Sequence, residues 1–466
     1  MGTLAALWWC GLKLGGKAPL LVLALYAAHP LAVSVGDSLR PYGLGVALAF
    51  LTSAFMWSLV KTPGTATFLR TLLVAILSVQ CLYRNAFFLI AFCCGAWVVT
   101  LARGDWKTTV QIGVIGLVAA LSLAPYWSLV IQGRESADIL AVQMPLAAIW
   151  RSLNEALRGA GQWTTFVWVA LFIASLGLSV LYGGRRGRWD MAYCGMVLVI
   201  SAPLYFLFLR ALHQTIFPWY FLSLMAMTAL MLDAILGAAD TWRPPVGRVM
   251  ADCASLLVTI PTGPRWAWLR QWRPLTGRAV LGLLLVAAGV SAGYSGACLR
   301  QSNIDLVAAR LQEASRPGDM ILVFPSAYGI SLGRYLDAGR WTTVEPTDEL
   351  RIHRTDLIKK AMMREDPIRP LREKVRVALR SGRKVWLVGD FGLPADAGHP
   401  PPILPPYTGK MERAAVKYIL NWMTQVAYLV KQHAAAGSRV EIPVPGGQAV
   451  NPRENVVVQV ASGWRD

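Results

Sequence analysis

Long apolar segments alternate with short polar ones over roughly the first 300 residues of the chain. A membrane-spanning helix needs about 20 mostly apolar residues, so this pattern predicts roughly eight or nine spans. Two short segments are separated only by Tyr83, Arg84 and Asn85, which predicts either a helix pair with a tight turn or one bent helix. The predicted cores are Ala18–Val35, Arg40–Val60, Phe68–Leu82, Asn85–Ala102, Thr109–Val130, Trp163–Tyr182, Met191–Leu209, Phe217–Leu236 and Ala279–Leu299.

Two further apolar stretches do not fit the pattern of a span. The stretch Leu4–Leu14 is too short to cross a bilayer and has no signal-peptide cleavage pattern, which indicates an interfacial or partial helix. The loop between Ile131 and Gln162 places apolar residues at helical spacing, which predicts an amphipathic helix. That helix either covers a cavity or simply connects two spans.

Beyond residue 300 the pattern changes to alternating helical and strand periodicities, which is typical of a compact α/β layer. The sequence therefore predicts a multi-pass transmembrane domain over residues 1–300 and a soluble α/β domain over residues 301–466. The expected helices are Ile304–Ala314, Ile330–Leu336, Asp356–Arg380 and Met411–Ala434, and the expected strands are Asp319–Phe324, Trp341–Val344, Lys384–Gly389, Arg439–Val444 and Asn455–Val460.

Composition supports this division. Hydrophobic residues make up 55% of the chain, charged residues only 15%, and the mean hydropathy is +0.46, which excludes an ordinary soluble enzyme. The net charge is +19, and residues 1–300 carry 22 Lys and Arg against nine Asp and Glu. Basic residues in short loops usually set membrane topology, and the soluble part mixes its charges, so nucleic acid is not an expected partner.

The basic loop residues also predict an orientation. Fifteen Lys and Arg fall in loops on one side of the predicted spans and six on the other, which places the N-terminus in the cytoplasm. Nine spans then bring residues 301–466 to the outer face, which predicts a periplasmic domain on a bacterial inner-membrane protein. The stretch 237–278, rich in Trp and Arg, is expected to lie on the cytoplasmic membrane surface.

Cysteine spacing and nucleotide-binding patterns add little. The seven cysteines all occur at or before Cys298, and none has the spacing of a metal knuckle or suggests a disulfide framework. The chain contains no GxGxxG or P-loop pattern. No cofactor is indicated, and the few acidic residues expected at the outer face do not argue for a metal site, although a divalent metal stays open.

The most informative charges lie at the predicted outer ends of spans, because charge near hydrocarbon is costly and usually has a partner or a task. Asp37 precedes the second span, where its carboxylate suits a helix start, and Arg40 follows three residues later. Arg40 is expected either to pair with Asp37 or to bind an anionic phosphate, with Pro41 and Tyr42 completing the motif.

Two more polar clusters are predicted on the same side. Arg84 and Asn85 offer hydrogen-bond donors between two short spans, although a tight turn uses the same residue types. The segment from Arg210 to Tyr220 includes His213 and a Phe-Pro-Trp-Tyr run. This composition suits a phosphate with a sugar face, while Trp and Tyr are also common in the interfacial belt of membrane proteins.

In the segments Leu21–Pro30 and Asp37–Tyr42, the chain resembles polytopic glycosyltransferases of the GT-C superfamily. The similar branch is the family 39-like one, which includes protein O-mannosyltransferases and aminoarabinose transferases. The order of spans, the loop after Tyr126 and the Phe-Pro-Trp-Tyr turn look similar. The resemblance implies a GT-C-like fold with a C-terminal extracytoplasmic domain. It also implies transfer of a sugar from a polyprenyl-phosphate-linked donor to an acceptor glycan, lipid or protein on the outer face.

The resemblance implies roles for individual residues. Asp37 matches the second acidic position of the family pattern and is the expected catalytic carboxylate, in a supporting role. Arg40, Tyr42, Arg84, Asn85, Arg210, His213 and Tyr220 are the expected substrate-binding residues.

Family members usually begin with a further span and an acidic outer loop that carries the catalytic base, and no acidic residue precedes Asp37 here. Three expectations follow: an incomplete N-terminus, an inactive relative, or a base supplied by a partner subunit. The alternative function is a non-catalytic transporter of lipid-linked sugars or an assembly scaffold, which should show broken helices and ionisable residues near mid-span. Asp233 is the nearest such residue.

Overall fold

The structure, a computed structural model, forms two compact units. Unit 1 comprises Met1–Trp127 and Met144–Ala297, and unit 2 comprises Ser128–Gln143 and Cys298–Asp466. A segment of the loop before residue 144 thus belongs to the same unit as the C-terminal residues. The described residues are 2–36, 42–128, 131, 138–140, 144–183, 187–240, 267–348, 354–392, 399–409, 413–452 and 454–466.

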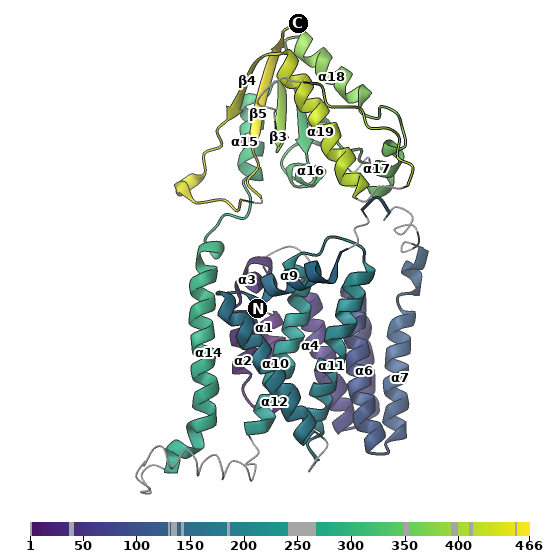
Figure 1. The fold of residues 1–466 in the computed structure, drawn as a ribbon, viewed down its shortest axis with the longest axis vertical. Helices are drawn as coiled ribbons and strands as arrows, with labels where there is room; N and C mark the ends of the chain where they lie inside the picture. The colour runs from purple at the N-terminus through teal and green to yellow at the C-terminus, as the bar shows by residue number, and fades with distance from the viewer. Residues whose placement is uncertain are drawn as a thin grey trace. The chain divides into compact units, whose positions relative to one another are not determined.

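Unit 1 is a bundle of apolar helices (Figure 1). Within the described ranges, six helical segments are long and apolar enough to cross a membrane, and Thr65–Cys81 and Ala279–Tyr294 are shorter apolar helices. These six helices indicate a multi-pass membrane protein. The sequence predicted roughly eight or nine spans, which is more than the six found among the described residues. The helices are α1 Gly2–Gly15, α4 Tyr42–Lys61, α5 Thr65–Cys81, α6 Asn85–Ala102, α7 Trp106–Leu121, α9 Leu146–Leu157, α10 Gln162–Tyr182, α11 Trp189–Ala211, α12 Leu222–Asp240 and α14 Ala267–Ala297.

The first predicted span is not one continuous helix. It consists of a short helix α2 (Leu20–Val22), a π-helical turn η1 (Leu23–Ala27) and helix α3 (Pro30–Gly36). Pro30 has no amide hydrogen to continue the preceding helix, and the Leu31 amide donates to Nδ1 of His29 instead. The uniformly apolar sequence gave no sign of the π-turn, which needs one extra residue per turn rather than a particular side chain.

The break is supported from a distant helix. Oδ2 of Asp233 in α12 accepts a hydrogen bond from the Val22 amide at 3.4 Å, and Asp233 is only 3% exposed. A helix start buried in an apolar bundle needs such an acceptor for its free amides. Asp233 therefore has a clear architectural task at this position.

The short N-terminal and loop segments also form helices. Helix α1 packs Leu7 and Cys10, both fully buried, into the bundle core, so it is more than an interfacial segment. Helices α5 and α6 are separate and meet at a tight turn, as the first of the two predicted alternatives required. Helix α9 is amphipathic, buries Ile149, and lies in the loop where an amphipathic helix was predicted. The predicted surface segment 237–278 lies largely outside the described residues.

Unit 2 is a small five-stranded sheet with helices on both faces (Figure 1). The strand order is β2-β1-β3-β5-β4, in which β1 pairs in parallel with β2 and β3, and β5 pairs antiparallel with β3 and β4. Helices α17, α18 and α19 bury one face and α15 and α16 the other. The bounds are β1 Met320–Phe324, β2 Trp341–Thr343, β3 Val385–Gly389, β4 Ala434–Val440, β5 Val458–Trp464, α15 Ile304–Ala314, α16 Ser326–Leu332, α17 Thr355–Met362, α18 Arg369–Arg380 and α19 Ala414–His433.

Most of these elements match the predicted pattern, with two instructive differences. The long helix predicted over Asp356–Arg380 is two helices, because the chain turns at Asp366 and Pro367. Strand β4 begins directly at Ala434, where a helix end was predicted, because Ala434 pairs with Trp464 of β5. Pairing along β5 thus overrides the helix preference of the alanines.

One piece of the loop before α9 is built into unit 2. Ile139, in the short helix η3 (Asp138–Leu140), is fully buried in the core formed with α17, α18 and α19. Asp138 pairs with Nζ of Lys359 at 2.9 Å and accepts a hydrogen bond from the hydroxyl of Tyr407 at 3.4 Å. Residues far apart in sequence therefore form one core.

Candidate functional site

Arg84 is the most unusual charged side chain of unit 1. It lies in the turn between α5 and α6, where the Asn85 amide donates to the Leu82 carbonyl at 2.8 Å. The turn directs the Tyr83 side chain outward, with 59% exposed, and the Arg84 side chain inward, with 4% exposed. The predicted turn residues thus include a buried cation rather than a surface one.

Tyrosines from three other parts of unit 1 surround this cation. The guanidinium carbon lies 4.6 Å from the centre of the Tyr42 ring at the start of α4. Nη1 donates to the Tyr220 carbonyl at 3.4 Å, and the Tyr205 hydroxyl of α11 donates to the same carbonyl. The cation–π contact and the hydrogen bonds to the Tyr220 carbonyl and to the Tyr205 side chain only partly replace water around the charge.

The remaining donors of Arg84 are open. Nε and Nη2 are buried and have no hydrogen-bond partner, and no ion pair of Arg84 occurs within the described ranges. Burying a charged group without a partner is costly, because the lost hydration is not replaced. The arrangement is therefore suited to an anion that would bind two parallel N–H donors.

Asn85, next in the chain, has a different task. Its Nδ2 donates to the Gly45 carbonyl at 2.8 Å and to Oγ of Ser78 at 3.0 Å, so it joins α4, α5 and α6. The side chain is 1% exposed. Asn85 holds the turn that presents Arg84, which is a positioning role.

The Phe-Pro-Trp-Tyr run forms the short 3-10 helix η5 (Pro218–Phe221) before α12. Phe217 stacks on Trp219, with ring centroids 4.4 Å apart, while Tyr220 supplies the carbonyl for Arg84. The structure thus brings together three of the predicted site residues, Tyr42, Arg84 and Tyr220.

Two predicted residues do not join this group. Arg210 and His213 are both exposed, and Nδ1 of His213 interacts with the nearby Ala211 carbonyl, at 3.0 Å. Their proximity to Tyr220 in sequence suggested that they would join the same cluster. Their side chains are exposed instead, whereas Arg84 is buried. Asp37 and Arg40 lie outside the described residues, and Tyr42 directly follows them in the chain.

Sequence reasoning missed two residues beside this group. Tyr205 stacks on Phe88 at 5.4 Å and is fully buried, and Tyr26, in the π-turn, lies within electrostatic range of Arg84. Both looked like ordinary apolar-helix tyrosines. A buried tyrosine hydroxyl needs a hydrogen-bond partner, so a tyrosine within an apolar helix could have indicated a nearby polar group.

His29 is a second buried polar residue, and it lies in the broken segment formed by α2, η1 and α3. It is 6% exposed, its Nε2 is buried, and its ring interacts with the Leu157 backbone at the end of α9. A Cβ at Gly159, which has a φ of +38°, would come within 2.7 Å of that nitrogen. The turn after α9 thus packs directly on His29, and a glycine is needed there.

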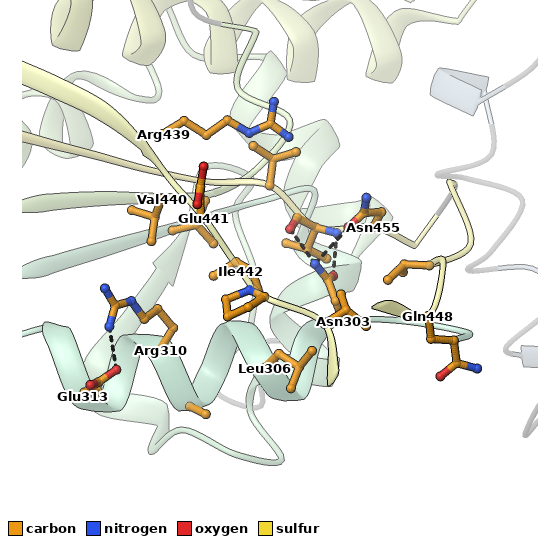
Figure 2. Close-up of a pocket in the computed structure, with 17 residues that line it drawn as sticks. Asn303, Leu306, Arg310, Glu313, Arg439, Val440, Glu441, Ile442, Gln448 and Asn455 are labelled. Atoms are coloured by element: carbon orange, nitrogen blue, oxygen red, sulfur yellow. Dashed lines mark hydrogen bonds and ion pairs between the residues drawn. The ribbon is translucent and has the colours of Figure 1, made fainter. Parts of the chain in front are cut away.

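A groove in unit 2 has no comparable feature. It has a volume of about 1310 Å³ and lies between α15 and the strand segment around Val440 and Ile442 (Figure 2). Two pairs of its polar groups satisfy each other: Arg310 pairs with Glu313 at 2.6 Å, and Asn303 donates to Asn455 at 2.9 Å, while Arg439 and Glu441 also line the groove.

No metal centre emerges from the part of the chain that the structure describes, because no three His, Cys, Asp or Glu side chains there are grouped to hold an ion. Comparison with protein-family models gave no match, and comparison with curated proteins gave none either. The geometry around Arg84 is accordingly the main basis for a functional proposal.

Proposed function

We propose that this chain is a membrane glycosyltransferase that moves a sugar from a polyprenyl-phosphate-linked donor to an acceptor at the outer face of a bacterial inner membrane. The observation that supports it best is the buried Arg84, with two open donor nitrogens beside Tyr42 and the Tyr220 carbonyl. A lipid phosphate at membrane level is the kind of anion that a cation inside an apolar bundle can bind.

The proposed chemistry needs few groups. The acceptor hydroxyl attacks the anomeric carbon of the sugar, the bond from that carbon to the phosphate oxygen breaks, and polyprenyl phosphate leaves with the electron pair. Arg84 stabilises the negative charge that grows on the leaving phosphate. A carboxylate takes the proton of the acceptor, and Asp37 is our candidate for this task or for support of a base on a partner subunit.

Binding can be tested without knowing the sugar. In nanodiscs, farnesyl phosphate should raise the unfolding temperature of the wild-type chain, and farnesol should not, because only the former offers the anion. Arg84→Met should abolish the shift. Arg210→Met is the matched control, since it removes an exposed arginine of the same unit and should leave the shift intact. Equal shifts with farnesyl phosphate in wild type and Arg84→Met would contradict the proposal.

One observation favours a second candidate, transport of a lipid-linked sugar. The broken segment from Leu20 to Gly36 and the buried Asp233 that binds it are features found in transporters. Flipping of a fluorescent lipid-linked sugar in proteoliposomes, without any glycoside product, is the result expected of a transporter. Product formation that depends on Arg84 is the result expected of the transferase.

A further inference from the structure

A small cavity in unit 2 lies beside the last turn of α19, on the face of the sheet that α17, α18 and α19 cover. Its volume is about 280 Å³. Ala435, Gly437 and Ala461 form its floor, and Gly437 pairs with Ala461 across β4 and β5. Because β4 is an edge strand with very small side chains here, the end of α19 leaves this part of the sheet open.

The cavity is lined by three cations and by no acidic side chain. Lys431 and Arg439 are exposed, and neither makes an ion pair within the described ranges. Arg465 donates from Nε and Nη2 to the last carbonyls of α19, both at 2.7 Å, so its charge offsets the negative end of that helix. Lys431 and Arg439 are thus left to act on a ligand.

Gln459 adds a neutral hydrogen-bonding group. It lies directly opposite Arg439 in the β4–β5 pairing, so the two side chains leave the sheet on the same face. Its Oε1 is buried and has no hydrogen-bond partner in the part of the chain that the structure describes. A buried acceptor of this kind is satisfied by a hydroxyl or amide donor from a ligand.

We propose that this cavity binds an anionic sugar, a single monosaccharide unit that carries a phosphate or a carboxylate. The anionic group binds Lys431 and Arg439, and a sugar hydroxyl donates to Oε1 of Gln459. The volume is near the lower end of the roughly 300–1,000 Å³ of ligand pockets and suits one sugar ring. This site is independent of Arg84 and of the transferase proposal.

The test is saturation-transfer NMR on the full chain in nanodiscs of zwitterionic lipid, with glucose 6-phosphate, glucuronate and glucose as probes. Both anionic sugars, or one of them, should give signals at least fivefold stronger than those of glucose, and the stronger probe identifies the anion. The double variant Lys431→Gln/Arg439→Gln should lose that signal. Lys417→Gln, which changes an exposed lysine of α19 outside the cavity, should keep it.

Gln459→Leu tests the hydroxyl contact separately. It should reduce the glucose 6-phosphate signal at least threefold while inorganic phosphate still competes with what remains. Both altered cations are exposed, so unchanged unfolding temperatures will show that the variants fold. Equal signals from glucose and the anionic sugars, or full signal in the double variant, would overturn the proposal.

Discussion

The two units each bury a charged side chain to the same extent, but the two side chains differ in how far their hydrogen-bonding groups have partners. Glu345 in unit 2 and Arg84 in unit 1 are each 4% exposed. The Glu345 carboxylate accepts a hydrogen bond from the Ser326 amide at the start of α16, and its carbonyl accepts one from Thr343. Arg84 has two nitrogens with no partner among the residues that the structure describes. Burial alone therefore does not identify a site, whereas burial with open hydrogen-bonding groups does.

The difference has an energetic consequence. A buried charge whose hydrogen bonds are used stabilises the fold, and removing it leaves its partners unsatisfied. A buried charge with open donors has a desolvation cost that the fold does not offset, and removing it relieves that cost. Substitutions at the two positions should thus change stability in opposite directions.

The largest expected effect is that of Arg84→Met. If Arg84 binds the leaving phosphate, sugar transfer should fall about a thousandfold, since loss of one charge-stabilising group typically costs 10²–10³ in rate and this one is buried. The unfolding temperature should stay the same or rise. The measurements are transfer of radiolabelled sugar from polyprenyl-phosphate donors and thermal unfolding in nanodiscs.

Arg84→Lys provides the control for this variant. It keeps the charge without the paired donors, so it should retain part of the activity. A marked fall in the unfolding temperature of Arg84→Met would instead make Arg84 an architectural residue like Glu345.

The next effect concerns the loop residue that belongs to unit 2. Ile139→Ala should destabilise unit 2 by about 3 kcal/mol, because a fully buried isoleucine leaves a cavity on truncation. Limited proteolysis should then cut within residues 298–466 at lower denaturant than in wild type. Asp138→Asn weakens a part-exposed ion pair and a long hydrogen bond from Tyr407, and it should have a much smaller effect. Wild-type resistance of Ile139→Ala would mean that the loop does not belong to this core.

Substitution of Glu345 tests the other side of the comparison with Arg84, because this buried charge has a hydrogen-bond partner. Glu345→Leu should lower stability by about 2 kcal/mol, because the buried Ser326 amide loses an acceptor. Glu345→Gln keeps an acceptor oxygen and should recover most of the loss. Chemical denaturation followed by limited proteolysis of unit 2 measures both variants. A Leu variant as stable as wild type would remove the contrast with Arg84.

Hydrophobic periodicity was a sound guide to the regular elements. The helix Ile304–Ala314 was predicted with its observed bounds, and the strand predicted over Lys384–Gly389 differs from β3 only by starting one residue earlier. Both have strong, uninterrupted patterns whose buried faces decide the structure. The broken segment after Leu20 could not be predicted, because a π-turn depends on packing and on Asp233, which lies more than 200 residues away.

The candidate site was predictable only in part. The donor-rich turn at Arg84 and the Tyr220 run stood out by composition, and the structure brings both beside Tyr42. Arg210 and His213 stood out equally but are exposed, because a sequence does not show which way a turn directs a side chain. Nothing in the local sequence indicated that Arg84 would be buried without a counter-charge from any residue that the structure describes.

The smallest expected effect is a pH dependence at Asp319. Burial raises the pKa of this carboxyl, but hydrogen bonds from the amides of Arg316 and Lys384 and from Nε1 of Trp386 outweigh it and leave the pKa below its usual value. The stabilisation is therefore fully present above the unfolded-state pKa of about 3.9 and is lost as the pH falls through the lower folded-state value.

Asp319→Asn should accordingly lower stability by about 1 kcal/mol at pH 6, where the carboxylate is charged and accepts these bonds. The difference from wild type should shrink as the pH falls below about 3.9 and should vanish below the folded-state pKa of Asp319, where both side chains are neutral. Thermal unfolding at pH 6, 4 and 3 measures it, with the exposed Asp337→Asn as a control. A constant difference across this range would show that the Asp319 contacts depend on shape rather than on charge, so that the contrast between satisfied and open charges would rest on Glu345 and Arg84 alone.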